Sequence, residues 1–432
     1  MRTPSVRDLP APLAAAARGI AEALAARGKQ AWIVGGTVRD LALARVPKDV
    51  DMATDAVPEE VEAAFERTVP VGRAFGVLIV PVSVADRRDV DVELATFRSE
   101  SGYTDARRPD EVTYGSSVEE DASRRDFTCN ALFLEPLRDE FRDPAGGLAD
   151  LAAGILRTVG DSAERFREDG LRLLRMARFQ AAIDLAPAPG LHAAARAERD
   201  ALRGVSAERV LHELERVFTG PRSAMALRIL DDCGLLERAL PRWRETAAAG
   251  GEWTAVQAAR LAVLDALPDP PGLELGLAAL LEVEPLGPGS DAALAAGAEL
   301  ARLLRTSRAT GDALAKRWTG RRALARAAAA GATRAERIRA VREPWYADAL
   351  ALARAWGQCS GEPTAPLDQL AEWRATLAEP DLFPAPFLHS DDLAQAGIAR
   401  GPEWGRLLRE AETLRLEGAW STREEALAWL RR

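Results

Sequence analysis

Asp49 and Asp51 are the residues whose types and spacing suggest chemistry most directly. They lie one residue apart in the run VPKDVDMAT. Side chains alternate between the two faces of a strand, so residues i and i+2 project the same way. Two carboxylates on one face repel each other, and a cation between them relieves the repulsion. The pair therefore predicts a metal site.

A double glycine upstream predicts a phosphate site beside this pair. Gly35 and Gly36 follow the apolar run 31–34 and precede a helix-like segment that carries Arg39. A glycine turn at the start of a helix leaves backbone N–H groups free to bind a phosphate. The 12-residue interval from Gly36 to Lys48 allows one short helix that returns the chain beside the turn. Phosphate site and metal pair together predict phosphoryl or nucleotidyl transfer.

Residues 89–94 offer a third carboxylate. Asp89, Asp91 and Glu93 alternate with apolar residues, which places three acids on one face of a predicted strand. We expect Asp89 at a solvated strand edge. Glu93 is the better metal ligand because it lies nearest the end that continues into ATFR.

Residues 123–131, SRRDFTCNA, combine two arginines, an acid and an amide. Arg124 and Arg125 can neutralise a triphosphate, and Asp126 or Asn130 can hold a ribose hydroxyl. Each residue alone would be an ordinary surface group, so the prediction depends on their occurring together.

The run FREDGLRLLRMARF at 166–179 predicts a helix that selects a nucleobase. Its charged residues recur at three- and four-residue steps, at Glu168, Asp169, Arg172, Arg175 and Arg178. The i, i+3 spacing places Asp169 and Arg172 on one face. Aspartate accepts from an exocyclic amine and arginine donates to a ring acceptor. Cytosine and adenine offer that pair on their Watson–Crick edges, whereas guanine and uracil do not. A surface ion pair is the alternative.

The elements that must position these residues change character near residue 160. Strands are predicted at 31–35, 49–53, 76–83, 88–97 and 129–134, and helices at 7–27, 58–67 and 147–152. From 161 onward alanine and leucine dominate and only helical patterns recur. We therefore predict an α+β protein: a part with a small mixed sheet at 1–160, then helical parts at 161–222, 223–345 and 346–432.

Composition excludes several other classes. The 432 residues are 47% hydrophobic and 28% charged, as in ordinary globular proteins. The sequence shows no 18-residue apolar run and no leader-like apolar segment, so we expect neither a membrane span nor a secretory signal. Three scattered cysteines suit a reducing cytoplasm, and three histidines without metal-ligand spacing argue against a histidine-based metal hydrolase.

The net charge of −9 hides a basic stretch. Twelve basic residues between positions 301 and 342 face only Asp312 and Glu336, for a local net charge of about +10. The stretch predicts a track for an RNA backbone, and a solvated helix face is the alternative. The candidate RNA contacts are Arg302, Arg305, Lys316, Arg317, Arg321 and Arg322.

In this order, the motifs resemble those of the bacterial class II tRNA nucleotidyltransferases, the CCA-adding enzymes, and of their poly(A) polymerase relatives. GGTVRD…KDVDMAT is similar to the family's catalytic motif, RRDFTCNA to its ribose and nucleotide motif, and EDGLR to its base-selecting motif. DPAGGLADLAAGILRTVGD and SAERVLHELERVF resemble its hinge and neck-supporting motifs. One departure is Leu43-Ala44-Arg45, where the family commonly has leucine-glycine. The resemblance is strong over residues 30–220.

The resemblance implies a seahorse-like enzyme with a nucleotidyltransferase head, then neck, body and tail. It implies that Asp49 and Asp51 bind Mg²⁺ in a two-metal site, with Glu93 as the third carboxylate. Asp169 and Arg172 would select the base. The substrates would be CTP, ATP and the 3′ end of tRNA, which the body and tail would hold. No obligatory protein partner and no membrane are implied.

Residues 98–120 correspond to the family's flexible loop, which is typically shortened in members that add only CC. Tyr103, Asp105, Arg107 and Arg108 stand here in a loop of apparently full length, which favours an enzyme able to add the terminal A. An A-adding enzyme, a CC-adding enzyme and a poly(A) polymerase are the alternatives within the family. An inactive RNA-binding scaffold is the alternative outside it.

Overall fold

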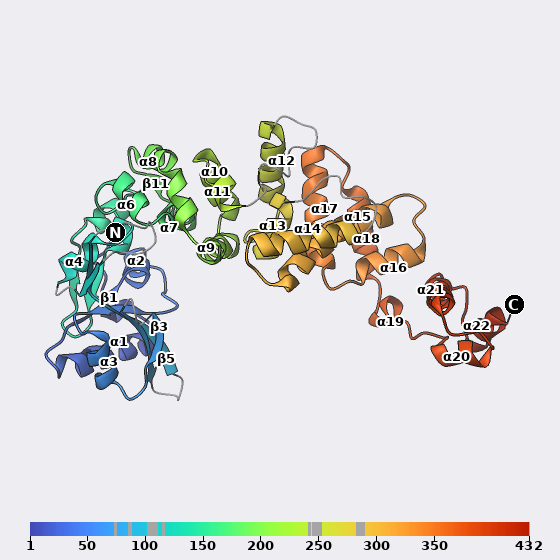
Figure 1. Ribbon diagram of the computed structural model, residues 1–432, viewed down its shortest axis with the longest axis horizontal. Helices are drawn as coiled ribbons and strands as arrows, with labels where there is room; N and C mark the ends of the chain where they lie inside the picture. Colours follow the sequence, from blue (N-terminus) through green and yellow to red (C-terminus); the bar gives the residue numbers. More distant parts are fainter. Residues whose placement is uncertain are drawn as a thin grey trace. The chain divides into compact units, whose positions relative to one another are not determined.

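The structure, a computed structural model, describes residues 1–72, 76–84, 89–101, 111–114, 117–240, 243, 253–281 and 290–431 (Figure 1). Contacts divide the chain into two compact units, Met1–Leu240 (unit 1) and Pro241–Arg432 (unit 2). The finer division into four parts stays a prediction.

Unit 1 begins with a mixed sheet of seven strands in the order β3-β4-β5-β2-β1-β8-β9. In this sheet β2 runs parallel to β5, and the other neighbouring pairs are antiparallel. The strands are β1 (Ala31–Val34), β2 (Asp51–Thr54), β3 (Val69–Gly72), β4 (Val77–Ser83), β5 (Asp89–Thr96), β8 (Phe133–Glu135) and β9 (Glu140–Arg142). Two smaller sheets pair β6 (Arg98–Ser101) with β7 (Glu111–Tyr114) and β10 (Ile155–Leu156) with β11 (Ala186–Pro187).

The predicted small mixed sheet is confirmed, but some of its strand boundaries were wrong. The strand predicted at 49–53 begins only at Asp51. The prediction at 129–134 was wrong in its first half, because Thr128–Asn130 forms a 3₁₀ turn and β8 begins at Phe133. The edge strands β3 and β9 were not predicted, since strands of four and three residues carry little alternation.

Amphipathic helices cover the sheet. Helix α1 (Ala11–Ala25) buries Leu13, Ile20 and Leu24, as their spacing predicts, and it contacts β1, β4 and β5. The other helices of this part are α2 (Gly36–Ala42), α3 (Pro58–Ala64), α4 (Val118–Ser123) and α5 (Gly147–Ala152). A 3₁₀ turn at Val6–Asp8 precedes α1.

The remainder of unit 1 is mainly helical, and one prediction fails there. The helix expected across 166–179 is broken: α6 ends at Glu168, and Asp169 is extended with φ −145° and ψ 104°. The helices are α6 (Ser162–Glu168), α7 (Leu171–Ile183), α8 (Leu191–Ala197), α9 (Ala207–Thr219), α10 (Ser223–Asp232) and α11 (Leu236–Ala239), with a 3₁₀ segment at Arg199–Gly204. A Cβ at Gly170 would lie 2.4 Å from the carbonyl oxygen of Ala201, so this glycine lets the break pack closely on the 3₁₀ segment.

Among the described residues of unit 2, all the regular secondary structure is helical. The helices are α12 (Trp253–Asp265), α13 (Leu273–Leu281), α14 (Ser290–Leu303), α15 (Arg308–Ala328), α16 (Arg334–Val341), α17 (Tyr346–Ser360), α18 (Ala365–Ala375), α19 (Glu379–Leu382), α20 (Ser390–Gln395), α21 (Pro402–Leu416) and α22 (Arg423–Leu430). A core around Leu324, Val341 and Leu350 joins α15, α16 and α17. Across the described part of the chain, no helix is both long and apolar enough to span a membrane.

Candidate active site

Two of the three predicted metal ligands lie side by side. Asp51 opens β2 and is the register partner of Glu93 on the parallel neighbour β5. Partnered residues on neighbouring strands project from the same face. Asp49 lies in the bend before β2, so the strand argument for Asp49 and Asp51 was wrong. The charge of Asp49 nevertheless acts on Asp51.

These acids form one electrostatic group that fits a divalent cation. Burial, the charge of Glu93 and the charge of Asp49 together raise the pKa of Asp51 to about 6. Such unrelieved repulsion is what a bound cation removes. Within the described residues, no three His, Cys, Asp or Glu side chains form a complete metal cage. A small divalent cation commonly takes one or two carboxylates and completes its shell with water and substrate phosphates, and the residues present fit that arrangement.

The predicted phosphate turn lies next to the acids. Gly35 joins β1 to α2 with φ 65° and ψ −127°, a conformation that favours glycine. Within α2, the hydroxyl of Thr37 accepts from the backbone N–H of Asp51 at 3.3 Å and donates to the carbonyl of Asp49 at 3.4 Å. The short helix therefore returns the acidic segment beside the glycine turn, as the spacing predicted.

Asp126 is the centre of a buried network. One carboxylate oxygen accepts from the N–H of Phe127 at 2.8 Å and from Nδ2 of Asn130 at 3.1 Å. The other accepts from Nε and Nη2 of Arg175 at 2.7 and 2.6 Å. Burial raises the pKa of Asp126, but the charge of Arg175 and these hydrogen bonds outweigh it and hold the pKa below 3.8. Arg39 donates to Oδ1 of Asn130 at 2.9 Å. The network thus fixes an ionised carboxylate next to an oriented amide.

Arg124 and Arg125 have an internal partner that the sequence analysis missed. Both guanidinium groups donate to Asp121, whose side chain is fully buried. Burial raises the pKa of Asp121, yet the two arginines hold it below 3.8. The i, i+3 and i, i+4 spacings in EEDASRR were a signal for this pairing. The positive charge predicted for a triphosphate is therefore already balanced in part.

The base-selecting pair is built differently from the prediction. The Asp169 carboxylate forms no hydrogen bond with the Arg172 guanidinium; it accepts from the N–H of Leu171 at 3.0 Å and from Arg209 at 2.7 Å. The backbone N–H of Arg172 donates to the carbonyl of Asp169 at 3.0 Å. Arg172 is buried and donates to Glu168 at 2.5 Å.

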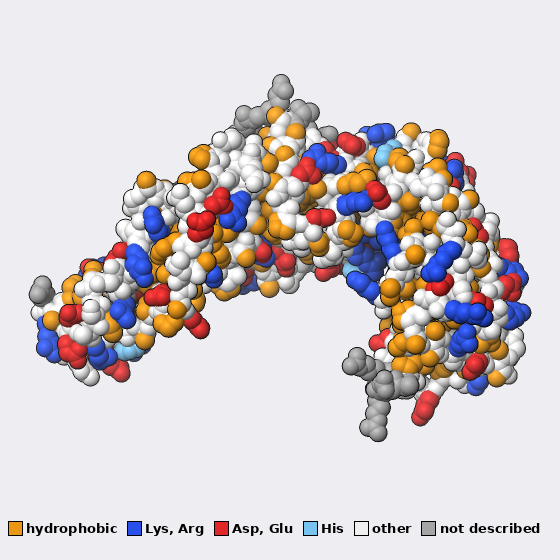
Figure 2. All heavy atoms as spheres, turned by 180° about the vertical axis from the view of Figure 1, so that it is seen from behind, with side chains coloured by type: hydrophobic (Ala, Val, Ile, Leu, Met, Phe, Trp, Pro, Cys, Tyr) orange, Lys and Arg blue, Asp and Glu red, His pale blue; other side chains and the backbone are white. Residues whose placement is uncertain are grey.

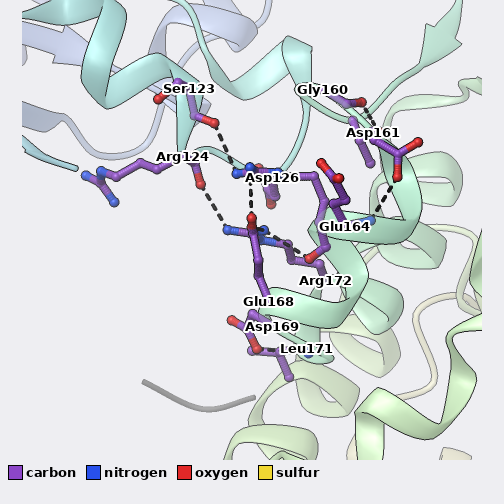
Figure 3. Close-up of polar contacts among 12 residues, drawn as sticks. Ser123, Arg124, Asp126, Gly160, Asp161, Glu164, Glu168, Asp169, Leu171 and Arg172 are labelled. Carbon is purple, nitrogen blue, oxygen red and sulfur yellow. Dashed lines mark hydrogen bonds and ion pairs between the residues drawn. The ribbon is translucent and has the colours of Figure 1, made fainter. Parts of the chain in front are cut away.

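Figure 3 shows the guanidinium of Arg172 between Glu168 and the carbonyl of Arg124. It donates to that carbonyl at 2.9 Å and to the carbonyl of Arg165 at 3.0 Å. Arg172 thus ties α7 to both α6 and the end of α4. The carboxylate of Asp169 and the guanidinium of Arg172 are each held by other groups and not by each other.

The guanidinium groups of three predicted arginines lie over the ring of Phe179. The guanidinium carbons of Arg178, Arg175 and Arg39 lie 4.2, 5.2 and 5.4 Å from the centre of its ring. Arg178 also donates to the buried Glu213 of α9. These contacts are within the range of cation–π attraction. A single aromatic ring on α7 therefore helps to hold three cations together.

All thirteen residues predicted for catalysis or nucleotide binding line one cleft of about 930 Å³ in unit 1. They are Gly35, Gly36, Arg39, Asp49, Asp51, Glu93, Arg125, Asp126, Asn130, Asp169, Arg172, Arg175 and Arg178. The lining also includes Lys48, Arg209 and Arg216, which were not predicted for the site. Arg209 and Arg216 lie seven residues apart and so share a face of α9, which was the available signal. The loop residues Tyr103, Asp105, Arg107 and Arg108 lie outside the described residues.

The cleft suits an anionic ligand. Nine basic and five acidic side chains line it, an excess of four positive charges. Basic groups around a polar cleft concentrate phosphate-bearing molecules. The protein as a whole carries a net charge of −9, so this positive region is a local feature.

Comparison with known proteins agrees with this geometry. Residues 31–157 match the poly A polymerase head domain, and residues 184–246 match a probable RNA- and SrmB-binding site of polymerase A. The CCA-adding enzyme of Geobacillus stearothermophilus is 41% identical over 222 residues, which are 51% of this chain and 53% of that protein. The CCA-adding enzyme of Bacillus subtilis is 42% identical over 210 residues, 49% and 51% of the two chains.

The parts of the chain at residues 31–157 and 184–246 are therefore similar to poly A polymerases, and about half of the chain is similar to CCA-adding enzymes. In these matches the chain spans about half the length of the curated relatives. A solved Bacillus stearothermophilus CCA-adding enzyme in complex with CTP is similar over 98% of this chain and 97% of its own, at 27% identity and a TM-score of 0.74. Nucleotidyltransferases like these relatives normally use divalent metal ions, and the Asp51 environment agrees with such an ion.

The RNA contacts predicted in unit 2 lie outside the residues that the two family models match, and several have internal partners. Arg317 donates to Asp348 and to the carbonyl of Ala313, and Arg321 lies over the ring of Trp356 at 5.1 Å. Arg305 and Arg322 also have partners, whereas Arg302 and Lys316 are exposed. Figure 2 shows Lys and Arg side chains interspersed with Asp and Glu on the face that it draws. The phosphate track stays a prediction.

Proposed function

We propose that this protein adds CCA to the 3′ end of tRNA, with CTP and ATP as substrates. The observation that carries the proposal is a single cleft that joins the acids Asp51 and Glu93 to Asp169 and Arg172. The relatives named CCA-adding enzymes, and the similar structure with CTP, support it. The acids alone would suit any nucleotidyl transfer, whereas the second pair supplies a means to choose the base.

Base selection in this proposal uses Asp169 as acceptor and Arg172 as donor. Leu171 and Arg209 hold the Asp169 carboxylate, and Glu168 holds the Arg172 guanidinium, so both groups are oriented before a base enters. Cytosine and adenine present an exocyclic amine beside a ring acceptor. Guanine and uracil would set a ring N–H against the arginine, leaving unpaired donors in a protein site, which is costly.

The transfer itself would take place at the acids of β2 and β5. We propose that Asp49 and Asp51 hold Mg²⁺, with Glu93 as the third carboxylate. When bound, Mg²⁺ supplies charge neutralisation at the attacking and leaving oxygens. The 3′-oxygen of the RNA forms a bond to the α-phosphorus, and the bond from that phosphorus to the leaving oxygen breaks, so pyrophosphate departs. Asp126 and Asn130 would hold the ribose, and the Gly35-Gly36 turn the phosphates.

Transcript extension tests the proposal. Three tRNA transcripts, ending before CCA, after C and after CC, are incubated with labelled CTP and ATP. We expect all three to be completed to CCA, with no incorporation from UTP or GTP. Extension of the CC-ended transcript alone would identify an A-adding enzyme, and products that stop at CC a CC-adding enzyme. Long adenylate tracts would identify a poly(A) polymerase.

An inactive RNA-binding scaffold is the alternative from a different class. Such a protein would bind the three transcripts and extend none. The repulsive cluster at Asp51 favours catalysis, because a scaffold has no use for a buried carboxylate with a raised pKa.

The remaining parts of the proposal concern the rest of the chain. We propose that residues 223–345 and 346–432 hold the body of the tRNA, with Arg302 and Lys316 as exposed candidates. The loop around Tyr103 would take part in adding the terminal A. The described cysteines, Cys129, Cys233 and Cys359, form no disulfide, which supports action in the cytoplasm.

A further inference from the structure

The basic residues of the cleft fall into two groups. Within the described residues, the structure pairs seven of the nine with carboxylates: Arg39–Asp40, Arg124–Asp121, Arg125–Asp121, Arg172–Glu168, Arg175–Asp126, Arg178–Glu213 and Arg209–Asp169. Lys48 and Arg216 line the same cleft and carry no ion pair to a described residue.

Four of the seven paired arginines are poor candidates for the main phosphate contact, because their acids are buried. Asp121 is 0% exposed, Glu213 is 2% exposed and Asp126 is 8% exposed. An arginine that turned from one of these acids to a ligand would leave a buried carboxylate unpaired, which is strongly destabilising. An unpaired cation at the same cleft binds an anion without that loss.

Arg216 has the position that such a contact needs. It is exposed in the last turn of α9, on the side of the cleft contributed by the helical part of unit 1. It lines the same cleft as the acids Asp49, Asp51 and Glu93. Lys48 directly precedes Asp49, and a change there cannot be separated from a change in the acidic segment.

We propose that Arg216 is a phosphate-binding residue of the cleft, held ready by α9 because no carboxylate neutralises it. A guanidinium matches the two oxygens of a phosphate with two parallel hydrogen bonds. The inference rests on the proposed function, which brings two kinds of phosphate to this cleft. These are the triphosphate of the incoming nucleotide and the last phosphodiester of the RNA 3′ end.

Equilibrium binding to the full-length protein, in EDTA so that no turnover occurs, tests the inference. The probes are CTP, inorganic tripolyphosphate and a tRNA transcript that lacks CCA. The variants are Arg216→Ala and Arg216→Lys, with Arg138→Ala as the matched control. Arg138 is an exposed arginine of unit 1 that does not line the cleft. Circular dichroism checks that each variant is folded, which is expected because both residues are exposed.

We expect Arg216→Ala to weaken binding of at least one probe about tenfold, the effect of losing one charged hydrogen bond. Arg216→Lys should recover part of the loss, and Arg138→Ala should bind like wild type. A loss for CTP and tripolyphosphate assigns Arg216 to the triphosphate. A loss for the transcript, with a salt dependence reduced by about one charge, assigns it to the RNA.

Two results would overturn the inference. In one, Arg216→Ala binds all three probes like wild type, or no worse than Arg138→Ala; the proposed function then stands without this contact. In the other, the wild-type protein binds none of the probes, and the proposed function fails together with the inference.

Discussion

At Asp51, folding stability and the proposed chemistry oppose each other. An ordinary aspartate titrates near 3.8, but burial, Glu93 and Asp49 raise the pKa of Asp51 to about 6. The folded protein therefore holds this proton more tightly than the unfolded chain does. The free energy of unfolding falls as the pH rises through this interval and stays lower above pH 6. A metal site needs several carboxylates close together, and their repulsion lowers the free energy of unfolding when no cation is bound.

Asp51→Asn should separate the two effects. In metal-free buffer at pH 8 we expect the variant to be more stable than wild type by roughly 1–3 kcal/mol, because the unfavourable charge is gone. Nucleotide incorporation should be abolished while tRNA binding stays unchanged. Chemical denaturation and transcript extension are the measurements. The control is Asp89→Asn, at an exposed position of β5 outside the cleft. It should change neither the free energy of unfolding nor nucleotide incorporation. Retained incorporation in Asp51→Asn would refute the metal assignment.

Arg172 is predicted to control which base enters. Arg172→Ala should lower kcat/KM for CTP and ATP, because the donor to the ring acceptor is lost. The ratio of these kcat/KM values to those for UTP and GTP should therefore fall. The substitution also removes the bonds to Glu168 and to the carbonyl of Arg124, so some loss of stability is expected. Glu168→Gln is the comparison, since it perturbs the support and leaves the arginine in place. Unchanged rejection of UTP and GTP by Arg172→Ala would exclude the selecting role.

The break between α6 and α7 is the element on which this selecting pair depends. Gly170→Ala would place a Cβ 2.4 Å from the carbonyl oxygen of Ala201. We expect a loss of about 1–3 kcal/mol in the free energy of unfolding, as for other overpacked sites. Gly19→Ala in α1 is the control, because a Cβ there meets nothing within 4 Å. Gly19→Ala should leave the free energy of unfolding unchanged or raise it. Equal effects of the two substitutions in urea denaturation would contradict the close packing.

The end of α2 allows a prediction of opposite sign. Ala44 has φ 55°, in the left-handed region that favours glycine. Ala44→Gly should therefore stabilise the protein by about 1 kcal/mol, although added freedom of the unfolded chain offsets part of the gain. Thermal unfolding measures the effect. Ala26→Gly, at a residue with φ −61°, should destabilise instead. A loss of stability in Ala44→Gly would show that the strain is not significant.

The elements show why sequence predicts part of this site and not all of it. Alternation in DVDVELAT was enough to predict β5 and the exposed face of Glu93, because the signal is local. The break at Gly170 was missed because a single glycine is tolerated within a helical pattern. The backbone of Ala201, which packs against this glycine, lies 31 positions further along the chain. The pairs Arg175–Asp126 and Arg209–Asp169 likewise join residues 49 and 40 positions apart. Local spacing indicates which residues are charged and which face they share, and tertiary packing decides their partners.

At the scale of the whole molecule, charge is divided unevenly. The chain has a net charge of −9, while the cleft has an excess of four positive charges. In unit 2 the basic stretch is partly balanced by acids far along the chain, since Arg339 and Arg342 both bind Glu412. A count over neighbouring residues could not show this pairing. The cleft therefore concentrates positive charge more than the basic stretch of unit 2 does.

This division predicts that nucleotide binding and RNA binding can be separated by truncation. Every residue that lines the cleft lies between Val34 and Arg216, inside unit 1. A fragment of residues 1–240 should bind CTP within about threefold of the full chain, because unit 1 is compact by itself. Its affinity for a tRNA transcript should fall at least tenfold if unit 2 supplies even one or two phosphate contacts. Calorimetry and filter binding measure the two affinities, and circular dichroism verifies folding.

Hydrogen exchange of the intact chain provides a second measurement, in which CTP should protect the amides of α7 and α9 and leave the exchange of residues 290–431 unchanged. A folded fragment that binds tRNA as tightly as the full chain would exclude unit 2 from RNA binding and place recognition in unit 1 alone.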